Sequence, residues 1–349
     1  MKTYRETMDE LRFTEQEKEA MVDRLLEGGG SRRRGLNLRR AAVAVAAAAV
    51  LTVGAGAAVV LTPAGEVFAS VLGGAPAQTE LLDWMGVPVG ASDTHNGVTI
   101  TADAIIGDAY SYAVVYSIVR EDGQPLAEDL EPLEHGVLPL VFDRADTSVG
   151  VIGGSYGSAY FYDADPSEPS IQYVEKTTSD VPLEPGTATA SFRNLYLMGK
   201  DFQDKIPVAE GKWKIRFQFS FPDSSVRLPG GQSFQLNGVE AILEGVTLSP
   251  LSIQADYTVK EELVWDNQSQ ENGRESEYDR EQAYRFFESL PLSLTLTDGS
   301  TVDLTGLGGS IEPETGRTVC RKGGVFEEIL DLSTVESVTV AGITLPVTP

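Results

Sequence analysis

Apolar and polar residues alternate along most of the chain after residue 95, and a period of two predicts β-strands. Residues 212–221 show the alternation most clearly, because every second position is a large apolar residue: Trp213, Ile215, Phe217, Phe219 and Phe221. One face of this strand is expected to be buried and the other to be in water, as in an antiparallel sheet.

Val98, Ile100, Ala102 and Ala104 also alternate with polar residues, so their side chains are expected on one face of a strand. Further strand-like stretches are 110–119, 137–142, 159–162, 171–174, 188–197, 239–248, 253–259, 292–296, 302–304, 325–330, 335–340 and 343–347. Many short strands with turn signals between them predict a mainly β fold, with two tandem β-sandwich domains of the immunoglobulin-like kind.

Turn residues and glycines mark the expected boundaries between domains. The loop 222–231 is rich in Pro, Asp, Ser and Gly, so we expect one β-sandwich in 96–225 and the second in 226–349. Residues 62–95 contain short apolar pieces broken by Gly and Pro, and they are expected to form a juxtamembrane segment.

That last expectation follows from the residues that precede it. Between Arg40 and Glu66 lie 25 residues without a charge, and ten of the 21 residues in 41–61 are Ala. As a helix, 41–61 would reach about 30 Å, one hydrocarbon thickness, so the stretch predicts a transmembrane helix. Two other interpretations are a signal peptide cleaved near Val67-Phe68-Ala69 and a buried, Ala-rich core helix.

The charges on the two sides of this stretch predict its orientation. Five arginines precede it closely: Arg32, Arg33, Arg34, Arg39 and Arg40. The positive-inside tendency therefore places the N-terminus in the cytoplasm and the large C-terminal body outside the plasma membrane. Residues 62–349 hold 17 Lys+Arg against 44 Asp+Glu, and this negative charge argues against direct binding of nucleic acid.

Residues 1–40 are expected to form a short helical cytoplasmic head. An apolar stripe within it consists of Met21, Val22, Leu25 and Leu26, and three glycines end the pattern at 28–30. The head is too short to bury this stripe well by itself, so it is either a protein-binding segment or a loosely folded, membrane-adjacent tail.

Few residues suit catalysis or metal binding. Residues 153–157 fit the G-x-S-x-G pattern around Ser155, but no His follows, so a Gly-rich hairpin or loop is the expectation. His95 and His135 are too few for a zinc site without thiolates, and the acidic loops 143–146 and 163–165 do not fit a calcium loop. We therefore expect no catalytic residue, no metal site and no bound cofactor.

The single cysteine, Cys320, allows no intramolecular disulfide and is expected to be a buried or unreactive thiol. An extracytoplasmic body without disulfides suits a bacterial envelope better than a eukaryotic cell surface.

The order of these features resembles the domain-of-unknown-function family numbered 4179. The resemblance lies in the helical head, the Arg-flanked span, Asn96-Gly97-Val98-Thr99-Ile100 and the strand in 112–119. The second half, with Leu236-Asn237-Gly238-Val239, 246–250 and the closing 335–347, is similar to a β-domain that commonly follows. Members are single-span envelope proteins of Gram-positive bacteria, often described as anti-sigma-factor-like. Many anti-sigma factors use a zinc-binding head with His and Cys, and this head has neither residue.

The resemblance implies a cytoplasmic head that holds a sigma factor and an outer sensor domain with an unknown ligand. Any sigma factor would be bound through helix-in-groove contacts of Met21, Val22, Leu25 and Leu26. The alternative is a structural or adhesive envelope protein with an inert head, and an envelope hydrolase using Ser155 is a third, less favoured interpretation.

Overall fold

The computed structural model describes residues 61–73, 76–127, 130–150, 153–199, 204–266 and 276–347. All of them belong to one compact unit of the chain, Ala48–Pro349. The predicted head and all but Leu61 of the predicted span lie outside the described residues. Within these ranges, no helix is both long and apolar enough to cross a membrane.

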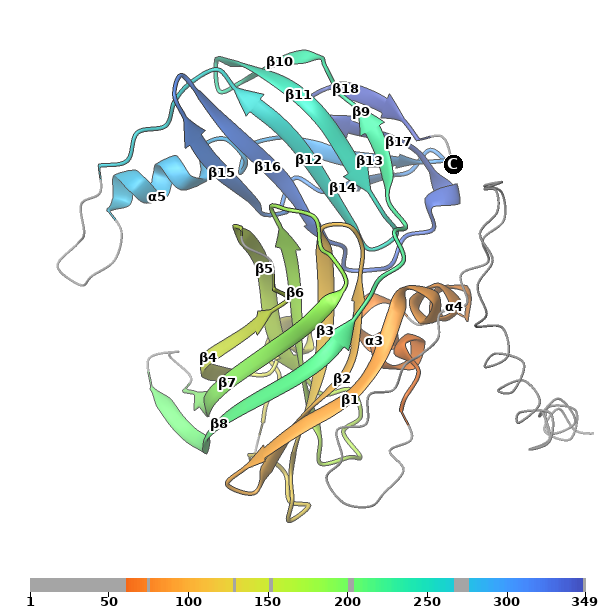
Figure 1. The fold of residues 1–349 in the computed structure, drawn as a ribbon, viewed down its shortest axis with the longest axis vertical. Helices are drawn as coiled ribbons and strands as arrows, with labels where there is room; N and C mark the ends of the chain where they lie inside the picture. The colour runs from red at the N-terminus through yellow and green to blue at the C-terminus, as the bar shows by residue number, and fades with distance from the viewer. Residues whose placement is uncertain are drawn as a thin grey trace, which may run out of the picture. The chain divides into compact units, whose positions relative to one another are not determined.

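The first eight strands form two antiparallel sheets, which we call the N-terminal β-half (Figure 1). The five-stranded sheet has the order β1-β2-β3-β6-β5: Gly86–His95, Val98–Gly107, Ser111–Arg120, Ile171–Ser179 and Ser155–Tyr162. The three-stranded sheet has the order β4-β7-β8: Leu140–Ser148, Gly186–Met198 and Lys205–Phe219. A short 3₁₀-helix, Glu134–Gly136, precedes β4.

One apolar core lies between these two sheets. Strand β8 contributes Trp213, Ile215, Phe217 and Phe219, which alternate with exposed residues as the sequence predicted. The Trp213 indole N–H donates to the carbonyl of Val98, 2.9 Å away, so the largest core side chain also joins the two sheets.

The end of β2 and the first six residues of β3 are buried on both faces, which explains their apolar runs. A β-bulge between Ala102 and Ala104 changes the alternation within β2. Ala102 therefore packs between the two sheets, whereas Ala104 packs on the opposite face. The expectation that Ala104 shares a face with Ala102 was wrong, because the extra residue of the bulge, Asp103, shifts the period by one.

Two helices cover that opposite face: α3, Ala64–Leu72, and α4, Pro76–Met85. Their buried residues form a cluster with Ala104, Ile106, Ala113, Val115 and Val174 of the sheet. The segment expected to be juxtamembrane thus packs on the β-structure. Its last ten residues are β1, an edge strand whose Gly and Pro residues had obscured the alternation.

The remaining strands form a larger and a smaller antiparallel sheet, which we call the C-terminal β-half. The larger sheet has the order β10-β11-β12-β16-β15, with β9 also paired to β11: Ser233–Leu236, Val239–Leu248, Ser252–Val259, Arg317–Val325, Gly309–Glu314 and Val226–Pro229. The smaller sheet has the order β14-β13-β17-β18: Thr301–Asp303, Leu292–Leu296, Val335–Val340 and Ile343–Pro346.

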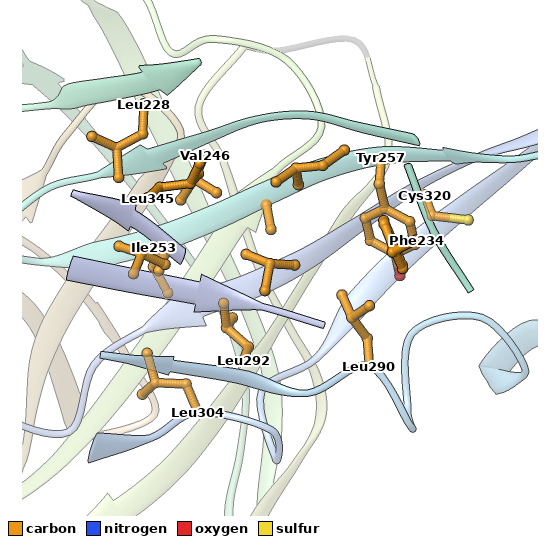
Figure 2. Close-up of a cluster of buried hydrophobic side chains, with 14 of the residues drawn as sticks. Leu228, Phe234, Val246, Ile253, Tyr257, Leu290, Leu292, Leu304, Cys320 and Leu345 are labelled. Carbon is orange, nitrogen blue, oxygen red and sulfur yellow. The ribbon is translucent and has the colours of Figure 1, made fainter. Parts of the chain in front are cut away.

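Both sheets of the C-terminal β-half contribute to one core, in which Tyr257 lies beside Phe234 and Cys320 (Figure 2). The Tyr257 hydroxyl donates to the carbonyl of Phe286, 2.6 Å away. Helix α5, Glu277–Tyr284, lies beside β15 in Figure 1, and a 3₁₀-helix, Leu332–Thr334, precedes β17. The prediction of a mainly β fold is confirmed.

Candidate functional site

The two β-halves meet at a buried carboxylate, Asp108, in the loop between β2 and β3. It accepts hydrogen bonds from the backbone N–H groups of Tyr110 and Ser111, at 2.9 and 2.8 Å. It also accepts from the hydroxyls of Ser249, in the turn between β11 and β12, and of Ser252, the first residue of β12, the latter at 2.6 Å. Since Asp108 is only 4% exposed, these four donors replace the water that it loses.

An apolar cluster of residues from α3, α4 and both β-halves, which we call the joint cluster, accompanies this polar contact. From α3 come Phe68 and Leu72, and from the C-terminal β-half come Leu251, Val325 and Ile329. The backbone N–H of Ile329 donates to the carbonyl of Leu72, 2.8 Å away. Helix α3 is therefore packed against both β-halves.

Lys176 of β6 makes a further contact between the halves. Its ammonium donates to the carbonyl of Phe326 and to the carboxylate of Glu327, each at 3.2 Å. The lysine is 3% exposed, whereas the Glu327 side chain is 88% exposed. Solvent screens such an exposed carboxylate, so the ion pair contributes little stability. The negative charge of Glu327 faces the solvent.

Arg321 of β16 lies between two carboxylates, Asp180 at 3.8 Å and Asp256 at 3.6 Å. Asp180 also accepts from the Ser310 hydroxyl at 2.6 Å, which ties the end of β6 to β15. Burial raises the pKa of Asp256, and the nearby guanidinium opposes that rise only in part.

A groove with a volume of about 580 Å³ opens beside these contacts. It lies between strands β5 and β6 on one side and β15, β16 and α5 on the other. Three aromatic side chains line it, Tyr156, Tyr284 and Phe287, of which the last two have ring centroids 5.5 Å apart. Glycines supply much of the rest: Gly157, Gly306, Gly308, Gly309, Gly323 and Gly324. The groove thus combines aromatic faces with accessible backbone.

Close packing requires several of these glycines. A Cβ on Gly157 would come within 2.0 Å of the Lys176 carbonyl oxygen, and one on Gly309 within 2.3 Å of the Arg321 carbonyl oxygen. A Cβ on Gly308 would lie 3.2 Å from the Tyr156 ring. The absence of side chains at these positions therefore allows the strands to approach and keeps the groove open.

A buried lysine, Lys322, fixes the α5 wall of the groove. Its ammonium donates to the carbonyls of Phe287 and Glu288, after α5, at 2.5 and 3.3 Å, and to that of Thr305 at 2.6 Å. Burial lowers the pKa of Lys322 to about 8. The lysine joins three segments that are distant in sequence, and all three border the groove.

Two half-buried carboxyls lie away from the groove. Asp103, the bulge residue of β2, accepts from the Ser117 hydroxyl at 2.5 Å, and burial raises the pKa of Asp103 to about 6. Glu175 of β6 accepts from the Thr147 hydroxyl at 2.7 Å, and burial likewise raises the pKa of Glu175. Each carboxyl is bonded to a hydroxyl, but neither has a histidine among the contacts described for it.

The residues that the sequence suggested for chemistry are not brought together. Ser155 begins β5 and is exposed, with a strand rather than a helix after it. The His95 ring meets Trp213 edge-on at 6.1 Å, and His135 occupies a turn with a φ of 58°. Burial raises the pKa of the Cys320 thiol to about 12. In the described part of the chain, no three His, Cys, Asp or Glu residues are grouped to hold a metal ion.

Met21, Val22, Leu25 and Leu26 of the head lie outside the described residues, as do the membrane-flanking arginines. The sequence missed the residues that connect the halves, Asp108, Ser249 and Ser252, because nothing in their neighbourhood distinguishes them from ordinary turn residues.

No family model matches the chain, and no curated protein matches it. A solved structure, that of a conserved domain protein from Bacillus anthracis, is similar over 74% of this chain and 78% of its own, with 17% identity and a TM-score of 0.45. This likeness is too distant to support a conclusion about function. The resemblance to the 4179 family stays a prediction.

Proposed function

We propose that this chain is a single-pass protein of a bacterial envelope, with its β-rich body outside the plasma membrane as a sensor. The charge asymmetry around the uncharged stretch 41–61 supports this topology. Each β-half would be a sandwich of the immunoglobulin-like kind, which is supported by the single core shared by the two sheets of each half.

The observation that carries the sensor proposal is the position of α3. Only Thr62 and Pro63 separate the proposed span from this helix, whose Phe68 and Leu72 are fully buried in the joint cluster. A ligand that favours a different arrangement of the two β-halves would have to move α3. The motion would then reach the span, since so short a connection transmits displacement instead of absorbing it.

Inside the cell, the head would act on a partner, which the resemblance suggests is a sigma factor. We propose that Met21, Val22, Leu25 and Leu26 form the apolar face of a helix that docks in a groove of that partner. The arginines at 32–34, 39 and 40 would hold the head close to the membrane surface.

Exchange of Leu25 and Leu26 for Asp in the full-length chain tests the regulatory part. In the native host, the doubly substituted chain should no longer capture a sigma factor, and transcription of that factor's targets should change. The matched control replaces Glu17 and Glu19 by Gln, which leaves the apolar stripe intact. Unchanged capture and transcription in the Asp variant would instead favour a structural or adhesive envelope protein with an inert head.

A further inference from the structure

Strand β5 is an edge strand without a charged residue or a proline to block pairing with another chain. Its eight residues, Ser155–Tyr162, include no charge and no proline, and Ser155, Gly157, Ser158 and Ala159 are exposed. Soluble proteins usually blunt such edges with lysine, proline or a covering segment. The lack of charge is notable in a chain of which 23% of residues are charged.

The backbone of β5 has hydrogen-bonding groups directed away from its sheet. The Phe161 carbonyl accepts from the N–H of Leu138, on the side opposite β6. Because these groups alternate along an antiparallel strand, Gly157 and Ala159 direct theirs to the same outer side as Phe161. Neither residue makes a backbone hydrogen bond there to another described residue. An extended peptide can therefore pair with this part of β5.

A strand added at this edge would place alternate side chains over the groove. Tyr156 and Ser158 line the groove and pair with Thr178 and Lys176 of β6, which line it too. Side chains of neighbouring strands that stand opposite each other share a face of the sheet. Every second side chain of the peptide would thus stand on the same face of the sheet as Tyr156. These side chains would face Tyr284 and Phe287 across the groove.

The negative charge at the groove favours peptides with basic side chains. Among the described residues that line it, only Lys176 and Glu327 are charged, and the lysine is buried and already bonded. Glu327 accepts from Lys176 at 3.2 Å, but its side chain is 88% exposed, so its carboxylate is the charged group that a ligand meets. The strongly acidic body adds a long-range attraction for cations, and the tyrosine rings can bind an ammonium or guanidinium through their faces.

We propose that β5 and the adjoining groove bind an extended peptide that carries Lys or Arg at alternate positions and pairs with the strand as an added edge. The peptide backbone bonds to Gly157 and Ala159, the apolar stems of its basic side chains pack on the aromatic rings, and one charge reaches Glu327. Such strand addition takes affinity from main-chain hydrogen bonds and specificity from alternate side chains. The binding does not depend on the membrane topology proposed above.

A display library of short linear peptides, selected against the full-length chain in lipid nanodiscs, tests this proposal. The recovered peptides should carry Lys or Arg at alternate positions. One of them would be synthesised, together with a version in which Glu replaces the basic residues. The dissociation constant of each would then be measured for the wild-type chain and for Ala159→Pro and Ala159→Ser. Proline removes the outward N–H without removing a bond to β6, whereas serine keeps the N–H.

We expect Ala159→Pro to weaken binding of the basic peptide by about tenfold or more, and Ala159→Ser to preserve it. Tyr284→Ser should weaken binding, and Glu327→Gln should reduce the preference for the basic peptide over its acidic version. These two variants test the proposal even if the proline variant fails to fold.

Equal binding by a folded proline variant, recovery of peptides without basic residues, or no recovery at all would overturn the proposal. A wild-type dimer that Ala159→Pro converts to monomer would also overturn it, in favour of pairing with a second copy. A failed topology map would leave these results unaffected.

Discussion

Asp108 shows how much of the contact between the β-halves depends on single buried polar groups. Its carboxylate is surrounded by four donors from two turns that are about 140 residues apart in sequence. A Gly-Asp pair after an apolar strand predicts a turn, and so does a Ser-Pro pair. Sequence alone could not predict that the two turns meet, because turn residues of this kind occur throughout the chain.

Replacement of Asp108 by Ala should destabilise the body by about 3–5 kcal/mol, since it leaves buried donors without an acceptor. The measurement is unfolding of the full-length chain by heat and by urea, with attention to whether the single transition splits as the halves separate. Asp298→Ala is the matched control, because Asp298 also accepts from a backbone N–H and a Ser hydroxyl, but within one exposed turn. Equal losses in the two variants would contradict the structural role assigned to Asp108.

Asp103 makes stability depend on pH in a predictable direction. Burial raises its folded pKa from 3.8 to about 6, so its contribution to stability is full below the unfolded pKa and is lost as the pH rises through about 6. Asp103→Asn does not ionise, and its neutral side chain still accepts from Ser117. The variant should be more stable than the wild type by about 1–2 kcal/mol at pH 7, and this gain should vanish toward pH 4.

Urea unfolding of the wild type and Asp103→Asn at a series of pH values between those limits gives the difference directly. A difference in the free energy of unfolding that stays constant across the series would show that Asp103 has an ordinary pKa in the folded protein.

At the scale of elements, the period of two predicted β8 well, because a strand with one wet face alternates strictly. Strands β2 and β3 alternate less regularly, because part of each is buried on both faces and a bulge at Asp103 shifts the period in β2. The sequence predicts a juxtamembrane segment where the structure has helices α3 and α4 and edge strand β1, because short elements with Gly and Pro carry weak signals.

Helix α3 is expected to be an essential part of the body. Phe68 has no exposed surface and packs in the joint cluster, so Phe68→Ala should destabilise the body by about 3–5 kcal/mol. The control is Ser70→Ala, which changes an exposed position of the same helix and should have a much smaller effect. Thermal unfolding of the full-length variants provides the measurement, and a loss for Phe68→Ala no greater than that for Ser70→Ala would place α3 outside the cooperative body.

At the scale of the whole molecule, the sequence shows the distribution of charge and hydropathy but does not predict the groove. The uncharged stretch, its arginines and the acidic body can be recognised in one reading of the chain. The groove is built by β5 and β6 from one half, and by β15, β16 and α5 from the other. No spacing in the sequence predicts that these segments border one groove. The sequence around Lys322, which bonds to one wall of the groove, does not distinguish it from other lysines in strands.

The central claim is that the β-rich body lies outside the plasma membrane, anchored by 41–61 with residues 1–40 in the cytoplasm. Reporter fusions in a bacterial host test it most directly, with alkaline phosphatase, active only outside, or a fluorescent protein, fluorescent only inside, joined after residue 40 and after residue 349. The account predicts fluorescence without phosphatase activity for the first junction and phosphatase activity without fluorescence for the second. A fluorescent, phosphatase-negative fusion after residue 349 would contradict it.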